Sequence, residues 1–286
     1  MRASDIFRLV LLAAIWGGSF VFLRVVAPVF GPIVTADLRV LIAWGALAIY
    51  CRTVGLDVGW RRFWKQYLII GAFNAALPFA LFAFAALHIP ASYSAILNAT
   101  SPFFGALCAG LWLGEKITLP KCLGFVLGIA GVALVTGVAP AAAGGSTTGA
   151  MAACLLAAMS YGFVSVYTKK FAAAANPRAI ACSSQLMAGL LLLPLTPLAP
   201  PPGAVTVIIA VNMVLFALLS SGVAFLLYFR LIADIGPTKS LTVTFLMPAF
   251  TMIWAGLFLG ETVTALMVVG CGLILAGTAL VVLRRR

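Results

Sequence analysis

Long apolar runs, separated by short connections rich in charge, proline or glycine, make up most of the chain. Each run is close to the ~20 residues that a helix needs to cross the hydrocarbon core of a bilayer. The runs are continuous and do not alternate with polar positions, so they predict helices and not the strands of a barrel. The expected fold is an all-α polytopic membrane protein with ten transmembrane helices. The runs lie near residues 9–26, 34–51, 67–87, 93–113, 119–137, 149–168, 179–197, 205–229, 239–259 and 265–283.

The composition excludes most soluble classes of protein. Hydrophobic residues form 64% of the chain and charged residues 8%, whereas a soluble domain carries about 25% charged residues. The net charge of +12 does not indicate nucleic-acid binding, because the basic residues fall in small groups between apolar runs. The six cysteines are scattered without a C-x-x-C pair, which favours buried free thiols over a metal site. No cofactor or metal is expected, and the lipid bilayer is the expected surrounding.

The basic residues also predict how the chain is oriented. If the N-terminus is cytoplasmic, the even-numbered connections and both termini hold sixteen of the eighteen Lys and Arg residues. The opposite connections hold none, and Arg24 and Arg39 are expected near the outer ends of helices 1 and 2. Lys and Arg concentrate in the cytoplasmic connections of membrane proteins. Both termini are therefore predicted to be cytoplasmic.

One phrase occurs twice, as LWLGEKIT from Leu111 and as LFLGETVT from Leu257. Eleven of the twenty-three positions in 113–135 are identical in 259–281. We interpret residues 1–137 and 149–286 as two five-helix repeats, joined on the outer side by the linker 138–148. Because five is odd, the second repeat enters the membrane from the other side, where Lys116 has the uncharged counterpart Thr262. The repeat is thus predicted to be inverted.

Prolines follow polar residues in the middle of three predicted helices. A proline inside a helix leaves the carbonyl four residues earlier without its hydrogen bond. Pro78, Pro102 and Pro248 are therefore candidate kinks or hinges, and they free the carbonyls of Asn74, Asn98 and Thr244 respectively. These polar residues are candidates for a substrate cavity near the midplane, with Ser101 beside them. The alternative is that neighbouring helices satisfy the freed groups and that the amides only join helices.

Other residues within the apolar runs carry weaker signals. Trp16, Ser19 and Tyr161 are further candidate substrate contacts, although aromatic residues at helical spacing more often serve packing. The segment GFVLG at 124–128 has the spacing of small residues that lets helices approach closely, either within the chain or between two copies. Each LGE is read as a glycine that ends one helix and an acid at the start of the next. Monomer and homodimer both stay open.

The acidic residues lie in tails and connections or, for Asp37, near an outer helix end, where it is expected to pair with Arg24 or Arg39. Proton-coupled carriers usually place a carboxylate within the membrane. His88, the single histidine, is expected at the outer end of helix 3 and is the one remaining candidate for coupling. We therefore predict facilitated transport without obligatory proton coupling.

The sequence resembles the EamA-type members of the drug/metabolite transporter superfamily. The resemblance rests on LAAIWGGSF near the start, on DLRV at 37–40, and on the doubled block in which a proline precedes LGE and two glycines follow. It implies ten helices in two inverted repeats and the export of small metabolites, often amino acids, across a bacterial inner membrane. The aromatic amino-acid exporter branch is the most similar. Helix 6 departs from the pattern, with Ser160 and Tyr161 where such proteins often keep a tryptophan.

The expected function is that of a secondary transporter in the inner membrane, which exports small and mostly neutral metabolites by alternating access at the repeat interface. Amino acids, including aromatic or hydrophobic ones, are the expected substrates. A channel or another permease of the same architecture is the alternative that the sequence leaves open. An enzyme is not expected, because a nucleophile with its base, or a set of metal ligands, is missing from the apolar runs.

Overall fold

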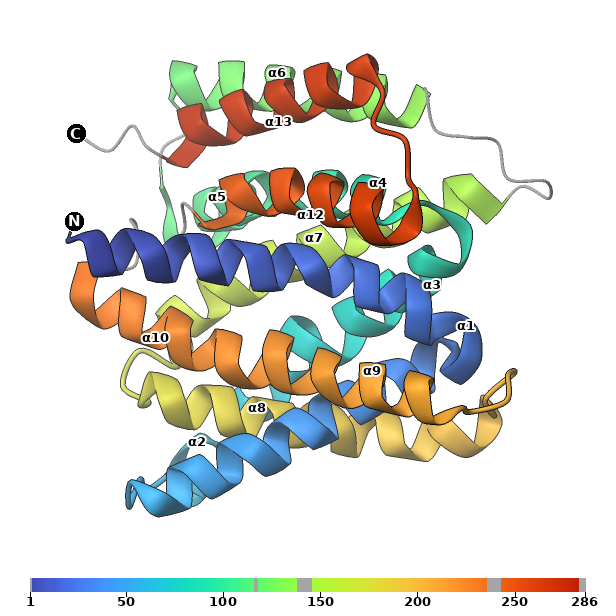
Figure 1. Cartoon of the computed structure of the whole chain (residues 1–286). Coiled ribbons are helices and arrows are strands. Elements are labelled where there is room, and N and C mark those ends of the chain that lie inside the picture. Colours follow the sequence, from blue (N-terminus) through green and yellow to red (C-terminus); the bar gives the residue numbers. More distant parts are fainter. Residues whose placement is uncertain (1, 116–117, 138–145, 236–242, 283–286) are drawn as a thin grey trace.

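The computed structural model describes residues 2–115, 118–137, 146–235 and 243–282. Over these residues the chain is helical and contains no strand, as the continuous apolar runs predict. Figure 1 shows the helices packed side by side, with most of their axes running in a similar direction. Their bounds are α1 Ala3–Thr53, α2 Trp60–Gly71, α3 Leu77–His88, α4 Ala91–Asn98, α5 Ser101–Leu113, α6 Leu119–Gly137, α7 Ser146–Phe171, α8 Pro177–Leu192, α9 Val207–Ala217, α10 Ala224–Ile235, α12 Val243–Leu259 and α13 Ala265–Val282.

Three short turns of other helix types complete these elements. The π-helical turns η1 (Ala72–Ala76) and η3 (Leu218–Val223) lie within otherwise α-helical segments, and the 3₁₀ turn η2 (Leu193–Leu198) extends α8. Six helical segments are long and apolar enough to cross a membrane, and one of them, Ala91–Leu113, consists of α4 and α5. Three shorter apolar helices accompany them, at Leu119–Val135, Val243–Leu259 and Ala265–Val281. The chain is a multi-pass membrane protein by these criteria.

The helix α1 contains the first two predicted helices as two arms. Its backbone bends at Gly31, which has φ 73° and ψ 165° and stands between Pro28 and Pro32. A residue with a side chain rarely adopts such a positive φ, so glycine is needed for the turn. The first arm covers residues 3–30 and the second covers 32–53, which agrees with the predicted runs 9–26 and 34–51. Figure 1 shows the turn where α1 changes from dark to lighter blue.

The helix predicted at 93–113 is in fact two helices. The helix α4 ends at Asn98 and α5 begins at Ser101, with Pro102 in its first turn. Proline fits the first turn of a helix because the N–H groups there have no intrahelical partner. Pro102 therefore starts a new helix and does not kink a continuous one.

The helices α6 and α13 form a close pair that lies along one side of the molecule in Figure 1. A Cβ atom on Gly277 would lie 2.5 Å from the carbonyl oxygen of Gly124, and one on Gly131 would lie 2.7 Å from that of Gly270. Glycines at these four positions let the two backbones touch. The close-packing glycines of the GFVLG segment thus serve a contact within the chain.

The buried and exposed side chains fit a molecule surrounded by lipid. The largest apolar core joins side chains from α1, α3 to α7, α9, α12 and α13. Large apolar side chains also stand exposed on the outside, among them Leu111, Leu198 and Val207. Four of the cysteines are buried free thiols, as predicted, whereas Cys108 is half-buried and Cys122 is exposed.

Candidate substrate site

The two π-helical turns mark corresponding places in the two halves of the chain. Pro78 lacks the N–H that would bond to Asn74, and η1 accommodates this defect in the turn that precedes α3. The turn η3 occupies the matching place before α10, but α10 contains no proline. Turns of this kind carry irregular backbone, and they occur frequently at functional sites.

Each π-turn receives a hydrogen bond from a helix of the other half. The indole Nε1 of Trp16 donates to the carbonyl of Ser220 in η3, at 3.1 Å. The hydroxyl of Ser160 donates to the carbonyl of Phe73 in η1, at 2.6 Å. Trp16 and Ser160 occupy similar places in the first helix of each half. The Ser160 hydroxyl therefore makes from the second half the kind of hydrogen bond that the Trp16 indole makes from the first. The two bonds tie the halves together at the irregular turns.

The candidates on α1 are both engaged with neighbouring groups. The ring of Trp16 lies 5.3 Å from that of Tyr228 and 6.4 Å from that of Phe225, between centroids. The hydroxyl of Ser19 donates to the carbonyl of Trp16 at 2.6 Å, and the side chain is buried. Ser19 therefore braces the turn that carries Trp16.

Asn74 and Tyr161 come from η1 and α7 respectively. Asn74 is half-buried in η1, and its amide makes no hydrogen bond within the part of the chain that the structure describes. The Tyr161 ring, on α7, stacks over Phe82 of α3 with 6.2 Å between centroids. Of the predicted polar candidates, Asn74 is the one whose donors and acceptor are left free for a ligand.

Local hydroxyls satisfy the break between α4 and α5. Thr100 donates to the carbonyl of Leu97 and Ser101 to that of Asn98, both at 2.6 Å. Thr278 of α13 donates to the carbonyl of Ala99 at 3.2 Å. The Asn98 carbonyl therefore accepts a hydrogen bond from Ser101, and the Asn98 side chain is half-buried.

The second proline-containing helix differs from the first. The helix α12 runs without interruption through Pro248, and Thr244 is half-buried in its first turn. Near Pro248, the hydroxyl of Thr251 donates to the carbonyl of Gly17 at 2.9 Å and to that of Met247 at 3.0 Å. The candidate residues Asn98 and Thr244 thus have different surroundings, because only Asn98 stands at a break between two helices.

Arg39 is the residue whose position the sequence does not reveal. The apolar pattern predicts it near an outer helix end, but it lies eight residues beyond the Gly31 turn, about 12 Å along the second arm of α1. Its side chain is buried, and its guanidinium Cζ lies 3.7 Å from the centroid of the Phe79 ring. A charged residue inside an apolar run is rare and usually functional, and that signal is present in the run 34–51.

The expected pairing of Asp37 with an arginine is absent. None of the five ion pairs among the described residues includes Asp37, Arg24 or Arg39. Arg24 donates instead to the carbonyl of Ala86, and Asp37 is buried with its Oδ1 atom unpaired. His88 ends α3, as predicted, with its ring 4.7 Å from that of Phe84.

The glycines of the two LGE segments end their helices as expected. The acid of the second segment does not cap the helix that follows it. Gly114 and Gly260 have φ near +65° and follow α5 and α12. Glu261, however, accepts hydrogen bonds from Ala91 N at 2.7 Å and from Ser92 Oγ at 2.9 Å, so it caps the start of α4 and not of α13. The start of α13 is capped by Thr264, whose hydroxyl accepts from Met267 N at 3.2 Å.

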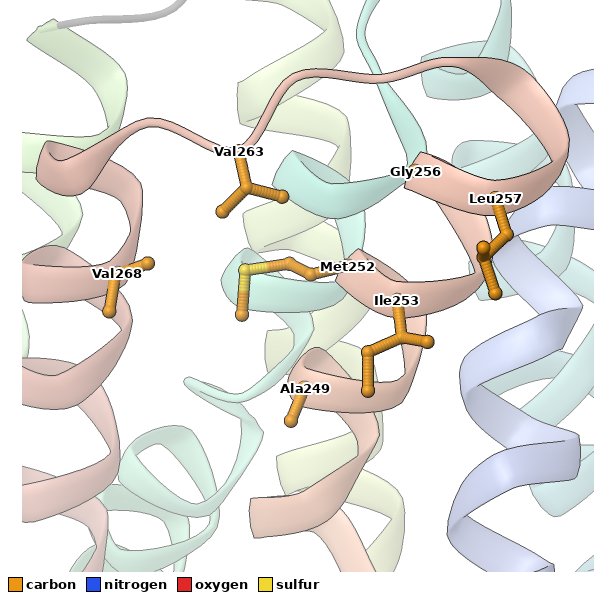
Figure 2. Close-up of a pocket in the computed structure, with 7 residues that line it drawn as sticks. All are labelled: Ala249, Met252, Ile253, Gly256, Leu257, Val263 and Val268. Atoms are coloured by element: carbon orange, nitrogen blue, oxygen red, sulfur yellow. The ribbon is translucent and has the colours of Figure 1, made fainter.

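An open groove of about 560 Å³ lies between α12 and α13 (Figure 2). Its lining is apolar and includes none of the predicted site residues. Several of its side chains, among them Ile253, Leu257 and Val268, are exposed on the outside of the molecule. The lining residues are Ala249, Met252, Ile253, Gly256, Leu257, Val263 and Val268. In the described part of the chain, no group of His, Cys, Asp and Glu side chains is arranged to hold a metal ion.

Comparison with known proteins places this arrangement in a family. The model of the EamA-like transporter family matches residues 4–137 and 148–283. A probable terminal-alkyne amino-acid exporter of Streptantibioticus cattleyicolor is 29% identical, over 98% of this chain and 93% of that protein. The uncharacterized transporter YvbV of Bacillus subtilis is 25% identical, over 96% and 90% of the two chains.

Two further proteins are similar to this chain. Protein PecM of Dickeya dadantii is 26% identical, over 90% of this chain and 84% of that one. A solved crystal structure shares the fold with a TM-score of 0.69 and 17% identity, and covers 99% of this chain and 98% of its own. With a family match over both halves, the chain belongs to the EamA-like transporter family and is a membrane transporter, not an enzyme.

Proposed function

We propose that the protein exports small, mostly neutral metabolites across a bacterial inner membrane by alternating access between its two halves. Amino acids, with aromatic or other hydrophobic side chains first among them, are the proposed substrates. The observation that carries this proposal is the reciprocal pair of bonds from Trp16 and Ser160 to the π-turns of the opposite half. Irregular backbone at the repeat interface is where secondary transporters bind their substrates. The exporter among the relatives is named for an amino acid.

The proposed architecture is ten transmembrane helices in two inverted five-helix repeats, 1–137 and 149–286, joined by an outer linker at 138–148. Two observations support it. The six long segments give seven crossings if the two arms of α1 are counted separately, and the three shorter apolar helices bring the number to ten. The glycine pairs Gly124–Gly277 and Gly131–Gly270 run in opposite directions along α6 and α13, as a two-fold relation requires. Most of the linker lies outside the described residues.

The proposed substrate site lies around the two π-turns and the α4–α5 break. Prolines at its edge are the proposed hinges. Asn74 is the proposed hydrogen-bonding residue, because its amide has no other partner in the described chain. Trp16 and Tyr161 are the proposed aromatic walls. The complete proposed set is Trp16, Ser19, Asn74, Asn98, Ser101, Tyr161 and Thr244, with hinges at Pro78, Pro102 and Pro248.

The orientation can be tested by labelling single cysteines in intact cells. In a chain otherwise free of cysteine, Ser146→Cys at the start of α7 should react with a membrane-impermeant maleimide from outside. Thr118→Cys, in the exposed connection before α6, should react only after the cells are opened. Both expectations follow from a cytoplasmic N-terminus and an odd number of helices per repeat. The opposite pattern of labelling would overturn the inverted-repeat proposal.

Transport can be tested with the purified protein in liposomes. Saturable counterflow of radiolabelled L-phenylalanine or L-leucine is expected, because a carrier exchanges a loaded substrate for an external one. Linear, unsaturable flux of both would indicate a channel instead. With equal substrate on both sides, no net movement is expected when a pH gradient is imposed. The titratable groups that could contradict this expectation are His88, at the end of α3, and Asp37, which is buried in α1. Accumulation that disappears in His88→Ala would identify that residue as the coupling site and contradict facilitated transport.

A further inference from the structure

The guanidinium of Arg39 lies between two aromatic rings that come from the π-turned segments. Its Cζ atom is 3.7 Å from the centroid of Phe79 and 4.5 Å from that of Phe216. Phe79 follows η1 by three residues, and Phe216 precedes η3 by two. The second arm of α1 thus delivers one cation to the place where the two irregular segments approach each other.

No protein anion balances this cation within the described residues. Arg39 is 7% exposed, yet no described carboxylate lies within ion-pair distance of it. Asp37 is two residues earlier on the same arm, where helix geometry turns the two side chains away from each other. Arginine is almost never fully buried without a partner, because removal of its hydration costs several kcal/mol. Contacts with ring faces offset part of that cost.

The hydrogen-bonding capacity of the guanidinium is also largely unused. Arginine has five N–H donors, and the one on Nε bonds to the hydroxyl of Ser221 at 3.0 Å. The other four face no acceptor in the described chain. Ser220, the neighbour of Ser221 in η3, has a buried hydroxyl that also lacks a partner there. Tyr161 interacts electrostatically with the guanidinium and supplies a further phenolic hydroxyl.

A buried cluster of donors around an unbalanced positive charge fits a single negative charge. The planar guanidinium fork matches a carboxylate with two parallel hydrogen bonds. The ring contacts from Phe79 and Phe216 leave the N–H edges for the ligand. A doubly charged phosphate would leave one negative charge buried without a partner, which the membrane interior disfavours. The charge count therefore favours a monocarboxylate.

We propose that Arg39 binds the carboxylate of the transported molecule, with Ser220 and Tyr161 beside it. This assignment deepens the proposed export function, on which it rests. It restricts the preferred substrates to molecules with one carboxylate, such as α-amino acids, and disfavours amines, amides and uncharged solutes. The substrate reaches the guanidinium when the halves move apart, because the closed arrangement buries the side chain.

The test compares molecules that differ only in charge. The probes are L-phenylalanine, L-phenylalaninamide, which lacks the carboxylate, and 3-phenylpropionate, which lacks the ammonium group. Each competes for counterflow of labelled L-phenylalanine into liposomes that hold the purified protein. We expect the two carboxylates to compete and the amide to be weaker by roughly 10- to 100-fold, the value of a charge-assisted hydrogen bond. Equal competition by the amide would overturn the proposal.

Variants of Arg39 test whether this residue causes the preference for a carboxylate. Arg39→Gln should remove the preference for the acid over the amide, and Arg39→Lys should keep part of it, since it keeps the charge but not the fork. Arg24→Gln is the matched control, because Arg24 is the other arginine deep within α1 and bonds to a backbone carbonyl. It should retain the full preference. If Arg39→Gln does not fold, Ser221→Ala takes its place in the test. This change removes the hydrogen bond that holds the Arg39 Nε atom, so it should reduce the preference for the acid over the amide.

The outcomes separate this inference from the function on which it rests. Transport of L-phenylalanine with no difference between acid and amide would leave export standing and reject the role of Arg39. Absence of amino-acid transport, together with saturable flux of labelled 3-phenylpropionate that Arg39→Gln abolishes, would reject amino-acid export and keep the carboxylate site. Retention of the acid preference in a folded Arg39→Gln protein would reject the site in either case.

Discussion

Replacement of Gly277 by valine should destabilise the protein by forcing apart the two helices α6 and α13. Even the Cβ atom would lie 2.5 Å from the carbonyl oxygen of Gly124 and 3.0 Å from the backbone nitrogen of Gly128. Backbone atoms cannot move aside as a flexible side chain can, so the helices must separate. Overpacking of this kind costs about 1–3 kcal/mol, which corresponds to a fall in Tm of roughly 3–10 °C. Thermal unfolding in detergent, followed by size-exclusion chromatography, measures it.

The control for this prediction stands on the same helix. A Cβ atom on Gly272 would meet no other atom within 4 Å, so Gly272→Val should leave the Tm nearly unchanged. Both changes have the same effect on intrinsic helix propensity, and they differ in the contacts that the added side chain makes with α6 and with Phe103 of α5. Equal losses of stability in the two variants would mean that the glycine pairs do not hold the helices together.

The hydrophobic pattern predicts the helices well because the bilayer leaves the backbone few choices. A continuous apolar run must satisfy its own N–H and C=O groups in lipid, and a helix does so within one segment. The runs 119–137 and 149–168 therefore agree closely with α6 and α7. The glycines of the two LGE segments are equally readable, since a positive φ after a helix favours glycine.

Details that depend on neighbouring helices cannot be read in the same way. The sequence identifies a proline at 102 and another at 248, yet only the first begins a new helix. The difference arises from hydroxyls at Thr100, Ser101 and Thr278 that bond to the carbonyls of the break. Thr278 is 179 residues from Ala99 in the sequence, so the local sequence does not predict this bond.

The candidate site shows the same division. The sequence identifies Asn74 and Pro78 because proline chemistry is local, and the π-turn lies where that chemistry places the defect. The turn η3 has no proline, and the bond from Trp16 that supports it requires a helix from the other half. Arg39 is recognisable as a charge in an apolar run, but its closeness to the start of that run leads to the prediction that it lies near the outer helix end. The depth of Arg39 depends on where α1 turns at Gly31, and that turn is known only from the structure.

Replacement of Glu261 by alanine should open the outer side of the transporter and slow export. In this structure the carboxylate accepts hydrogen bonds from Ala91 N, at 2.7 Å, and from both the N–H and the hydroxyl of Ser92, at 3.2 and 2.9 Å. It thereby joins the connection after α12 to the first turn of α4, across the two halves. An anion at a helix N-terminus also meets the favourable end of the helix dipole.

The proposed orientation places this contact on the outer side, which is therefore closed. Export requires the contact to break when substrate leaves and to form again when the carrier resets. Loss of about 2 kcal/mol from the closed state shifts the balance between closed and open forms by roughly 30-fold. The variant should accumulate in an outward-open form, and its rate of counterflow should fall.

The buried thiol of Cys154 reports this opening directly. Cys154 lies on α7 and is fully buried, with its thiol 3.6 Å from the hydroxyl of Ser94. Ser94 belongs to α4, the helix that Glu261 caps. With Cys154 as the single cysteine, Glu261→Ala should increase its reaction with an impermeant reagent added from outside by on the order of tenfold or more. Glu261→Gln, which keeps an acceptor but loses the charge, should lie between. Thr262→Ala, the exposed neighbour, should react as the parent does. If Cys154 is equally protected in the Glu261→Ala protein, some other contact closes the outer side, and the bonds to Ala91 and Ser92 serve only to begin α4.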